Sequence, residues 1–301
     1  MAQVRRPRNG GKARVHFYTN SLPTTAEVAA FGPPIPLPCG RCVGCRLERS
    51  RQWAVRLMKE LKLHDRSSFL TLTYDDKHLP LTKKGLPTLS VEDVQLFLKR
   101  LRKHFAPEPL RFFQCGEYGE KKFRPHYHMI LFGEDFCKDR FRVEDSRSGF
   151  SQYESATLTR LWQNGRATIS EVSFESAAYV ARYTLKKWYG VGQDFHYNGR
   201  KPEFTTMSRR PGIGAGYYSE FKNDLYPLDE IVPAIGRPAS LPPRYFDRLL
   251  EKENPELYQL VKKKRVEGLD FWTDVNSTDT RLATRERIKK ALIKNCLKRS
   301  I

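Results

Sequence analysis

The sequence predicts an α+β fold in which helices pack on a mainly antiparallel sheet, related to the ferredoxin-like plan. Stretches with strand and helix patterns follow one another between residues 68 and 188 in the order β, α, β, β, α, β, α. Two of the strands are separated by a short polar segment, which is typical of an antiparallel hairpin. The chain has 301 residues and is 39% hydrophobic, so it can bury a core of this kind.

The first three elements are predicted from the spacing of apolar residues. A helix is expected over about 46–64, where apolar residues recur at helical spacing. The stretch SFLTLTYDD, residues 68–76, is apolar and ends in acidic turn residues, as expected for a buried strand. A second helix is expected after Ser90, its predicted N-cap. Its buried stripe comprises Val94, Phe97, Leu98, Leu101 and Phe105.

The hairpin and the elements after it complete the predicted unit. The strands RFFQCGEYG and HYHMILFG are joined by the polar segment EKKFRP, residues 120–125. A short helix near 155–163 and a strand at 167–173 follow. The last element is a helix from about 174 to 188.

Composition divides the chain into three predicted parts. Residues 1–64 form a basic N-terminal arm with a cysteine cluster and the first helix. Residues 65–226 hold the sheet and its helices. Residues 227–301 comprise a proline-rich linker and a basic helical region.

The charge of the chain indicates a polyanionic partner. It has 54 Lys and Arg against 34 Asp and Glu, a net charge of +20, which favours nucleic acid. We find neither an apolar span of ~20 residues nor a secretory signal, which argues against a membrane or secreted protein. The chain is therefore expected inside the cell, with its six cysteines reduced or metal-bound.

Two histidines at the start of the second hairpin strand suggest a metal site. Side chains alternate along a strand, so His126 and His128 share one face while Tyr127 points to the other. Antiparallel pairing could bring the Glu117 carboxylate beside both imidazoles, with Glu120 as the alternative third ligand. Such a site suits Mg²⁺ or Mn²⁺ bound to a phosphate oxygen. The alternative is a pair of histidines with a purely structural role at the sheet edge.

The predicted helix from 174 carries two tyrosines one turn apart. A helical wheel places Tyr179 and Tyr183 opposite the expected core stripe, with Lys186 beside them and Lys187 flanking. The expected stripe comprises Phe174, Ala178, Ala181, Leu185 and Trp188. A phenol with an ordinary pKa of ~10 needs help as a nucleophile. A metal ion on the scissile phosphate would supply that help, giving a covalent phosphotyrosine bond to DNA.

Taken together, these motifs resemble the replication initiation proteins of microviruses, most closely those of the gokushovirus branch, within the HUH endonuclease superfamily. The resemblance rests on PCGRCVGC, FLTLTYDD, GEYG followed by RPHYH, YVARYTLKK and SRRPGIGAGYY, which span residues 38–218. It implies the HUH endonuclease fold, with His126 and His128 binding Mg²⁺ or Mn²⁺. It also implies Tyr179 and Tyr183 as alternating nucleophiles, with Lys186 as the associated lysine.

The activity implied by the resemblance is rolling-circle initiation in the cytoplasm of an infected bacterium. The protein would nick the viral-strand origin, form a 5′-phosphotyrosine bond and leave a 3′ hydroxyl for the host polymerase. The second tyrosine would rejoin the displaced single strand. We find no P-loop in the sequence, so a host helicase is expected to open the duplex.

Basic residues near these motifs are candidates for contacts with DNA. They are Arg182, Lys187, Arg209 and Arg210. The last two lie beside the glycine-rich GIGAG, which is expected to be a loop near the DNA. The basic C-terminal helices could add affinity that does not depend on sequence.

Three cysteines at two-residue intervals form a partial zinc motif. They are Cys39, Cys42 and Cys45, and a fourth ligand is missing nearby. Candidates for it are His16, His64 and Cys296. The alternative is that the three are reduced thiols that order a tight turn.

Two other functions compete with the nicking enzyme. One is a non-enzymatic, zinc-containing DNA-binding or packaging protein, which would explain the charge and the cysteines. The other is a plasmid or transposon nickase of the same superfamily, because paired tyrosines would suit it too. The sequence leaves the oligomeric state open.

Overall fold

The computed structural model describes two compact units, which are residues 1–45 and residues 46–301. The described residues are 2–5, 14–17, 24–26, 29, 43–119, 122–146, 149–183, 192–267 and 279–298, without the side chains of 2–5, 14–17, 182–183 and 293–298. In the first unit, strands β1 (Ala2–Arg5) and β2 (Arg14–Phe17) pair antiparallel. The division into three parts predicted from composition stays a prediction.

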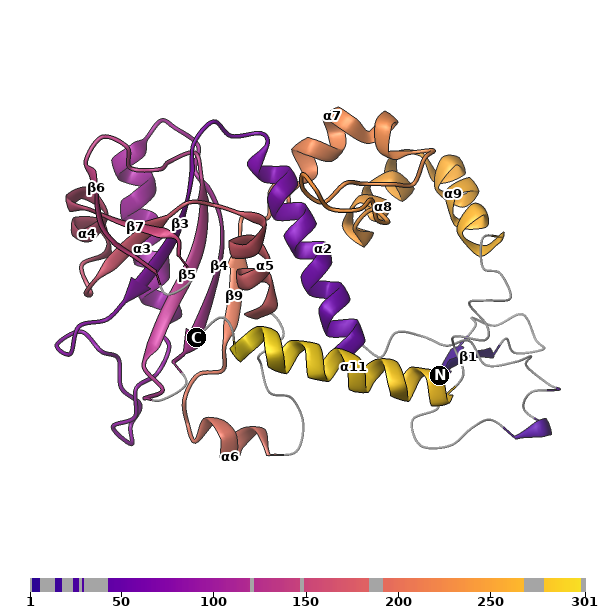
Figure 1. The fold of residues 1–301 in the computed structure, drawn as a ribbon, viewed down its shortest axis with the longest axis horizontal. Helices are drawn as coiled ribbons and strands as arrows, with labels where there is room; N and C mark the ends of the chain where they lie inside the picture. Colours follow the sequence, from indigo (N-terminus) through magenta and orange to yellow (C-terminus); the bar gives the residue numbers. More distant parts are fainter. Residues whose placement is uncertain are drawn as a thin grey trace. The chain divides into compact units, whose positions relative to one another are not determined.

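The second unit is built on a seven-stranded antiparallel sheet with the strand order β6-β7-β8-β3-β5-β4-β9 (Figure 1). The strands are β3 (Ser67–Thr73), β4 (Arg111–Tyr118), β5 (Pro125–Phe132), β6 (Arg140–Asp145), β7 (Ser151–Ser155), β8 (Ala167–Ser170) and β9 (Phe204–Met207). This sheet with its helices confirms the predicted α+β fold and is consistent with the HUH plan.

Helices before, between and after the strands complete the unit. They are α2 (Val43–Leu61), α3 (Val91–Phe105), α4 (Ala156–Trp162), α5 (Phe174–Tyr183), α6 (Gln193–Tyr197), α7 (Ala215–Leu225), α8 (Arg244–Glu253), α9 (Pro255–Glu267) and α11 (Asp279–Lys298). Within the described residues, none of these helices has both the length and the apolar composition needed to cross a bilayer.

Helices cover both faces of the central strands. Figure 1 shows α3 and α4 on one side of the sheet and α2 and α5 on the other. On the first side, Phe97, Tyr127 and Trp162 are fully buried in one core cluster. On the second side, a separate cluster includes Leu57 of α2 and Val180 of α5. The sheet therefore has a face under α5 on which a side chain from that helix can reach the central strands.

The long elements agree with their predictions and the edge strands were missed. The helix expected at 46–64 is α2, and Ser90 caps α3 as predicted, its hydroxyl accepting from the Asp93 amide at 3.1 Å. The hairpin of β4 and β5 is confirmed. Strands β6, β7 and β9 were not predicted, because edge strands are short and half-exposed and carry little apolar pattern.

Tyr127 fixes how β5 sits on the helical layer behind it. Its hydroxyl accepts from the Ser90 amide at 2.8 Å and donates to the Ser90 carbonyl at 2.9 Å. It also lies 2.9 Å from the Tyr74 hydroxyl, which in turn donates to Asp93. Because Tyr127 is committed to this face, its neighbours His126 and His128 must point to the other.

The proline-rich stretch predicted as a linker is packed into a third core cluster. Tyr226 and Ile231 are only 2% and 3% exposed, and both belong to a cluster with residues of α7, α8 and α9. The Tyr226 hydroxyl donates to Asp247 at 2.7 Å, and Arg265 of α9 binds both Asp247 and Asp229. The prolines therefore belong to a fixed connection, and the prediction of a free linker was wrong.

The glycine-rich GIGAG is held against α2 by a buried carboxylate. Glu60, 2% exposed, accepts from the Gly214 amide at 2.6 Å and also from Arg111 of β4. Gly214 has a φ of +82°, and a Cβ on Gly212 would lie 2.4 Å from the Tyr245 hydroxyl. These glycines serve close packing and a left-handed turn, which differs from the expected loop near DNA.

We expect Glu60→Gln to lower the free energy of unfolding by about 3 kcal/mol at pH 7, because Arg111 would lose its buried counter-charge. Burial alone would raise the pKa of Glu60, but hydrogen bonds from His64 and Gly214 and the charge of Arg111 hold that pKa below its usual range. The stabilisation is thus present above the unfolded pKa of ~4.3 and is lost as the pH falls further.

Urea unfolding at pH 7 and at a series of lower pH values tests this prediction. The gap between wild type and Glu60→Gln should narrow below about pH 4.3. Glu48→Gln is the matched control, because Glu48 lies on the same helix but its ion pair with Arg51 is exposed. That variant should lose less than about 1 kcal/mol. Equal losses in the two variants would contradict the role of Glu60.

Candidate metal centre

Three potential ligands converge because of the register of two neighbouring strands. Glu117 lies opposite His126, and Cys115 lies opposite His128, in the antiparallel pairing of β4 and β5. Residues two apart on a strand share a face, so all three potential ligands, Glu117 and the two histidines, project from the same side of the sheet. This is the face under α5. The pairing predicted from the sequence is therefore the one that the structure has.

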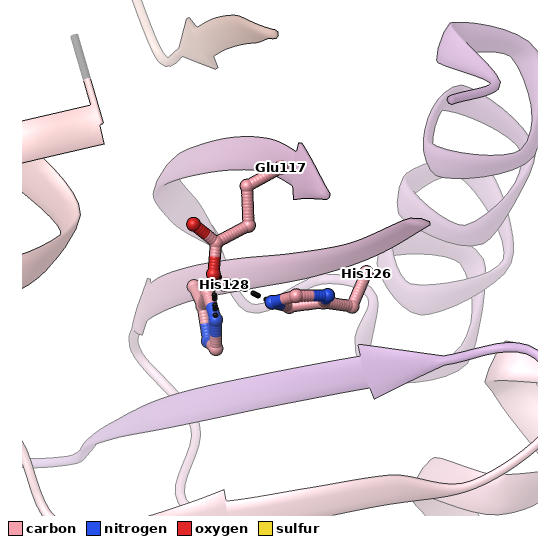
Figure 2. Close-up of side chains that lie close together, drawn as sticks. All are labelled: Glu117, His126 and His128. Carbon is pink, nitrogen blue, oxygen red and sulfur yellow. Dashed lines mark hydrogen bonds and ion pairs between the residues drawn. The ribbon is translucent and has the colours of Figure 1, made fainter. Parts of the chain in front are cut away.

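The two imidazoles are turned toward one carboxylate oxygen (Figure 2). The Glu117 Oε1 atom lies 2.5 Å from His126 Nε2 and 3.1 Å from His128 Nε2. One ligand atom from each residue lies within 4.8 Å of the others, a spacing that could hold a metal ion. Glu117 and His128 are only 3% and 7% exposed. One carboxylate and two imidazoles suit a divalent cation with positions left for water or substrate.

Outer contacts orient both rings. His126 Nδ1 lies 3.3 Å from the Arg124 carbonyl, and since a carbonyl can only accept, this nitrogen carries a proton. His128 Nδ1 lies 3.1 Å from the Thr71 hydroxyl on β3. In both rings Nε2 is left to face Glu117 or a metal, as is usual for histidine ligands held by a second partner.

Glu117 is held in its ionised form. Burial alone would raise its pKa, but hydrogen bonds from His126 and His128 and the charges of these imidazoles outweigh burial. The pKa of Glu117 therefore lies well below its usual range. A carboxylate that stays charged when buried is ready to bind a cation at neutral pH.

Tyr179 of α5 reaches the three potential ligands from above the sheet. Its hydroxyl donates to Glu117 Oε1 at 3.4 Å, and its ring packs edge-on against His128 with a centroid distance of 5.2 Å. The buried residues of α5 are Ala177, Val180 and Ala181, and Tyr179 packs beside them. The prediction that Tyr179 lies opposite the core stripe was therefore wrong. Because the ligands lie on the face that α5 covers, a tyrosine that reaches them must point toward the sheet.

Other predicted site residues lie partly or wholly outside the described residues. Tyr183 and Arg182 are in the last turn of α5, and nothing is described of their side chains. Residues outside the description altogether are Cys39, Cys42, Glu120, Lys186 and Lys187. Cys45 lies in the first turn of α2 and is half-buried. The zinc site therefore stays a prediction.

Arg209 and Arg210 lie far from the metal centre. They follow β9, whose last residue, Met207, pairs with Phe113. They are exposed near the start of β4, where Arg111 donates to the Pro211 carbonyl at 2.9 Å. Glu117 is six strand positions beyond Arg111, a distance of ~20 Å. The structure does not bring these arginines together with the three ligands.

Sequence reasoning missed two residues that support the site. Thr71 contacts His128, as described, and Arg124 ties the hairpin to the end of β3 by donating to Asp76 at 2.6 Å and to the Tyr74 carbonyl at 2.7 Å. The alternation in FLTLTYDD places Thr71 on one face with Thr73, away from buried Leu70 and Leu72. A polar residue on the inner face of a central strand was the signal that could have identified Thr71.

Comparisons with known proteins identify relatives of the chain. A family model for the replication-associated protein ORF2 matches residues 67–188, the stretch that holds the metal centre. The chain is 38% identical over 237 residues to the replication-associated protein ORF2 of Spiroplasma virus 4, covering 76% of this chain and 72% of that protein. It is 31% identical over 267 residues to the replication-associated protein VP4 of Bdellovibrio phage phiMH2K, covering 84% and 78%.

A further relative, the replication-associated protein ORF4 of Chlamydia phage 1, is 32% identical over 267 residues, covering 82% of this chain and 63% of its own length. No solved structure matches the chain. These relatives all share the description of phage replication-associated protein, which confirms the resemblance found in the sequence. The chain therefore belongs to the family of replication-associated proteins of microvirus-like phages and has a role in replication.

Proposed function

We propose that the protein initiates rolling-circle replication by nicking the viral-strand origin of single-stranded phage DNA. The observation that carries this proposal is the Tyr179 hydroxyl, 3.4 Å from a Glu117 carboxylate oxygen that also contacts both histidines. A tyrosine at the edge of a metal site can attack a phosphate that the metal holds. The relatives named as replication-associated proteins support the same role.

In the reaction, the Tyr179 oxygen attacks the scissile phosphorus and loses its proton. The bond from phosphorus to the 3′ oxygen breaks, and that oxygen takes up a proton to become a free 3′ hydroxyl. The 5′ phosphate stays on the tyrosine. Glu117, His126 and His128 would hold Mg²⁺ or Mn²⁺, which when bound withdraws charge from the phosphate and orients it. The hydrogen bond from Tyr179 to Glu117 positions the phenol beside that phosphate.

The second half of the proposed cycle uses Tyr183. It lies one helical turn after Tyr179, so its backbone follows the first tyrosine along the same helix. Tyr183 would cut the regenerated origin, and the freed 3′ hydroxyl would then attack the first phosphotyrosine and close the displaced strand. Lys186, Arg182 and Lys187 would offset the charge of the DNA backbone. A host polymerase would extend the 3′ hydroxyl, and a host helicase would open the duplex in the cytoplasm of the infected cell.

The test is a search for a covalent bond between protein and DNA. The protein is incubated with labelled single-stranded DNA carrying candidate origins of its own genome, with Mn²⁺ or with a chelator, and run on a denaturing gel. A slow, protease-sensitive band that needs Mn²⁺ is expected. Tight DNA binding without an adduct on any part of that genome would contradict the proposal and favour a non-enzymatic DNA-binding protein.

A further inference from the structure

An exposed aromatic side chain lies in the hairpin between the metal ligands. Phe123 is in the connection from β4 to β5, between Glu117 and His126, and is 41% exposed. It is three residues from His126, which places its backbone within ~10 Å of the ligand. A large apolar ring is therefore in contact with solvent beside the candidate site.

The backbone at Phe123 is held in an unfavourable conformation. Its φ is +49°, in the left-handed region that a bulky residue rarely adopts. The Phe123 amide donates to the Gly119 carbonyl at 3.0 Å, and the Gly119 amide donates to the Arg124 carbonyl at 3.0 Å. These bonds fix the turn. Glycine or asparagine would suit this conformation better, so a phenylalanine here costs stability without filling the core.

Arg200 stacks on the exposed ring. Its guanidinium carbon lies 4.9 Å from the centroid of the Phe123 ring. The segment that carries Arg200 is anchored by two bonds of Lys201, whose carbonyl accepts from Tyr118 at 2.7 Å and whose amide donates to Thr88 at 2.9 Å. The position of Arg200 beside the hairpin is therefore fixed by contacts other than the stack itself.

The Arg200 side chain also has an unused donor. Its Nε atom is buried and has no hydrogen-bond partner among the residues that the structure describes. A buried donor without a partner costs free energy, and such a group calls for an explanation. Exposed Lys122 and Lys201 are the sequence neighbours of the stacked pair and add positive charge. An aromatic face, a guanidinium plane and flanking lysines together match the parts of an unpaired nucleotide.

We propose that Phe123 and Arg200 form a stacking platform for one base of the single-stranded DNA next to the metal centre. The base stacks on the pair, and the Arg200 Nε proton goes to an acceptor on that nucleotide. This inference rests on the proposed function, because it assumes that single-stranded DNA is the substrate. It adds a residue-level anchor that sets which phosphate lies over the three ligands.

The test is a double-mutant cycle between the protein and the base. Labelled oligonucleotides of the origin found in the adduct assay, each with one abasic position, are titrated by fluorescence anisotropy with chelator present, so that no cleavage occurs. For the wild type, one abasic position near the cut is expected to weaken binding about tenfold. Phe123→Ala should bind the intact strand about tenfold more weakly and lose nothing more at that position.

Control variants separate stacking from folding. Phe141→Ala removes an aromatic side chain that is 58% exposed, from edge strand β6, and should bind all oligonucleotides as the wild type does. Phe123→Trp should retain the effect of the abasic position. Phe123→Gly should weaken DNA binding while leaving the thermal midpoint unchanged or raised, because glycine suits a positive φ.

The outcomes distinguish the platform from the proposed function. If the wild type forms adducts but Phe123→Ala binds every oligonucleotide as tightly as the wild type does, the platform is wrong and the nicking activity stands. Equal additional losses of Phe123→Ala at every abasic position would overturn the platform in the same way. If the wild type neither binds single-stranded DNA nor forms adducts, both inferences fail.

Discussion

Glu117→Gln is expected to weaken Mn²⁺ binding at the three ligands by more than about 100-fold and to abolish metal-dependent cleavage. Loss of an outer-shell partner typically costs about 10- to 100-fold in metal affinity, and Glu117 would be a ligand itself. It is also the group that joins the site, because its Oε1 contacts both histidines and Tyr179. An amide keeps the shape of the side chain but removes the charge that attracts the cation.

Calorimetric titration of the metal-free protein with Mn²⁺ measures this effect without reference to activity. Glu134→Gln is the control, because Glu134 is also a buried carboxylate, 6% exposed, but lies just beyond the opposite end of β5. That variant should titrate as the wild type does. Unchanged Mn²⁺ affinity in Glu117→Gln would exclude Glu117 as a ligand and move the site elsewhere.

Replacing both tyrosines, Tyr179 and Tyr183, with phenylalanine is expected to abolish covalent adducts while leaving DNA binding within about twofold of wild type. The change removes the two phenol oxygens that could attack and keeps both aromatic rings. Tyr179→Phe or Tyr183→Phe alone should keep some nicking and lose strand transfer, since one nucleophile would remain. Adduct formation on a denaturing gel and binding by anisotropy give the two readouts.

Tyr153→Phe serves as the control for this pair. Tyr153 is a half-buried tyrosine on β7, away from the three ligands, and its loss should leave adduct formation unchanged. Adducts formed by the double variant at the wild-type rate would rule out both tyrosines as nucleophiles. Loss of DNA binding together with adducts would instead assign them a role in holding the strand.

The metal centre could be predicted from sequence because it depends on local rules. Strand alternation puts His126 and His128 on one face, and a short antiparallel hairpin brings Glu117 opposite them whatever the rest of the fold does. The N-cap at Ser90 follows from an equally local rule. Patterns of this range survive folding, because no distant element needs to be known for them to hold.

The parts that sequence could not give depend on contacts between distant segments. The direction of Tyr179 is set by which sheet face α5 covers, and that contact joins residues 62 positions apart. Gly214 resembles a loop residue until its amide is seen to bind Glu60, 154 positions away. The packing of Tyr226 against Asp247 is hidden in the same way by a proline-rich composition.

The position of Tyr127 has a consequence for when the metal centre can exist. The three ligands come from two strands, and a slip of one residue between them would turn both histidines into the opposite core. Tyr127, clamped to Ser90 by two bonds, allows only the register in which the ligands meet. A nascent or misfolded chain therefore has no assembled centre. Under the proposed function, incomplete copies of this protein would leave the DNA of the host cell uncut.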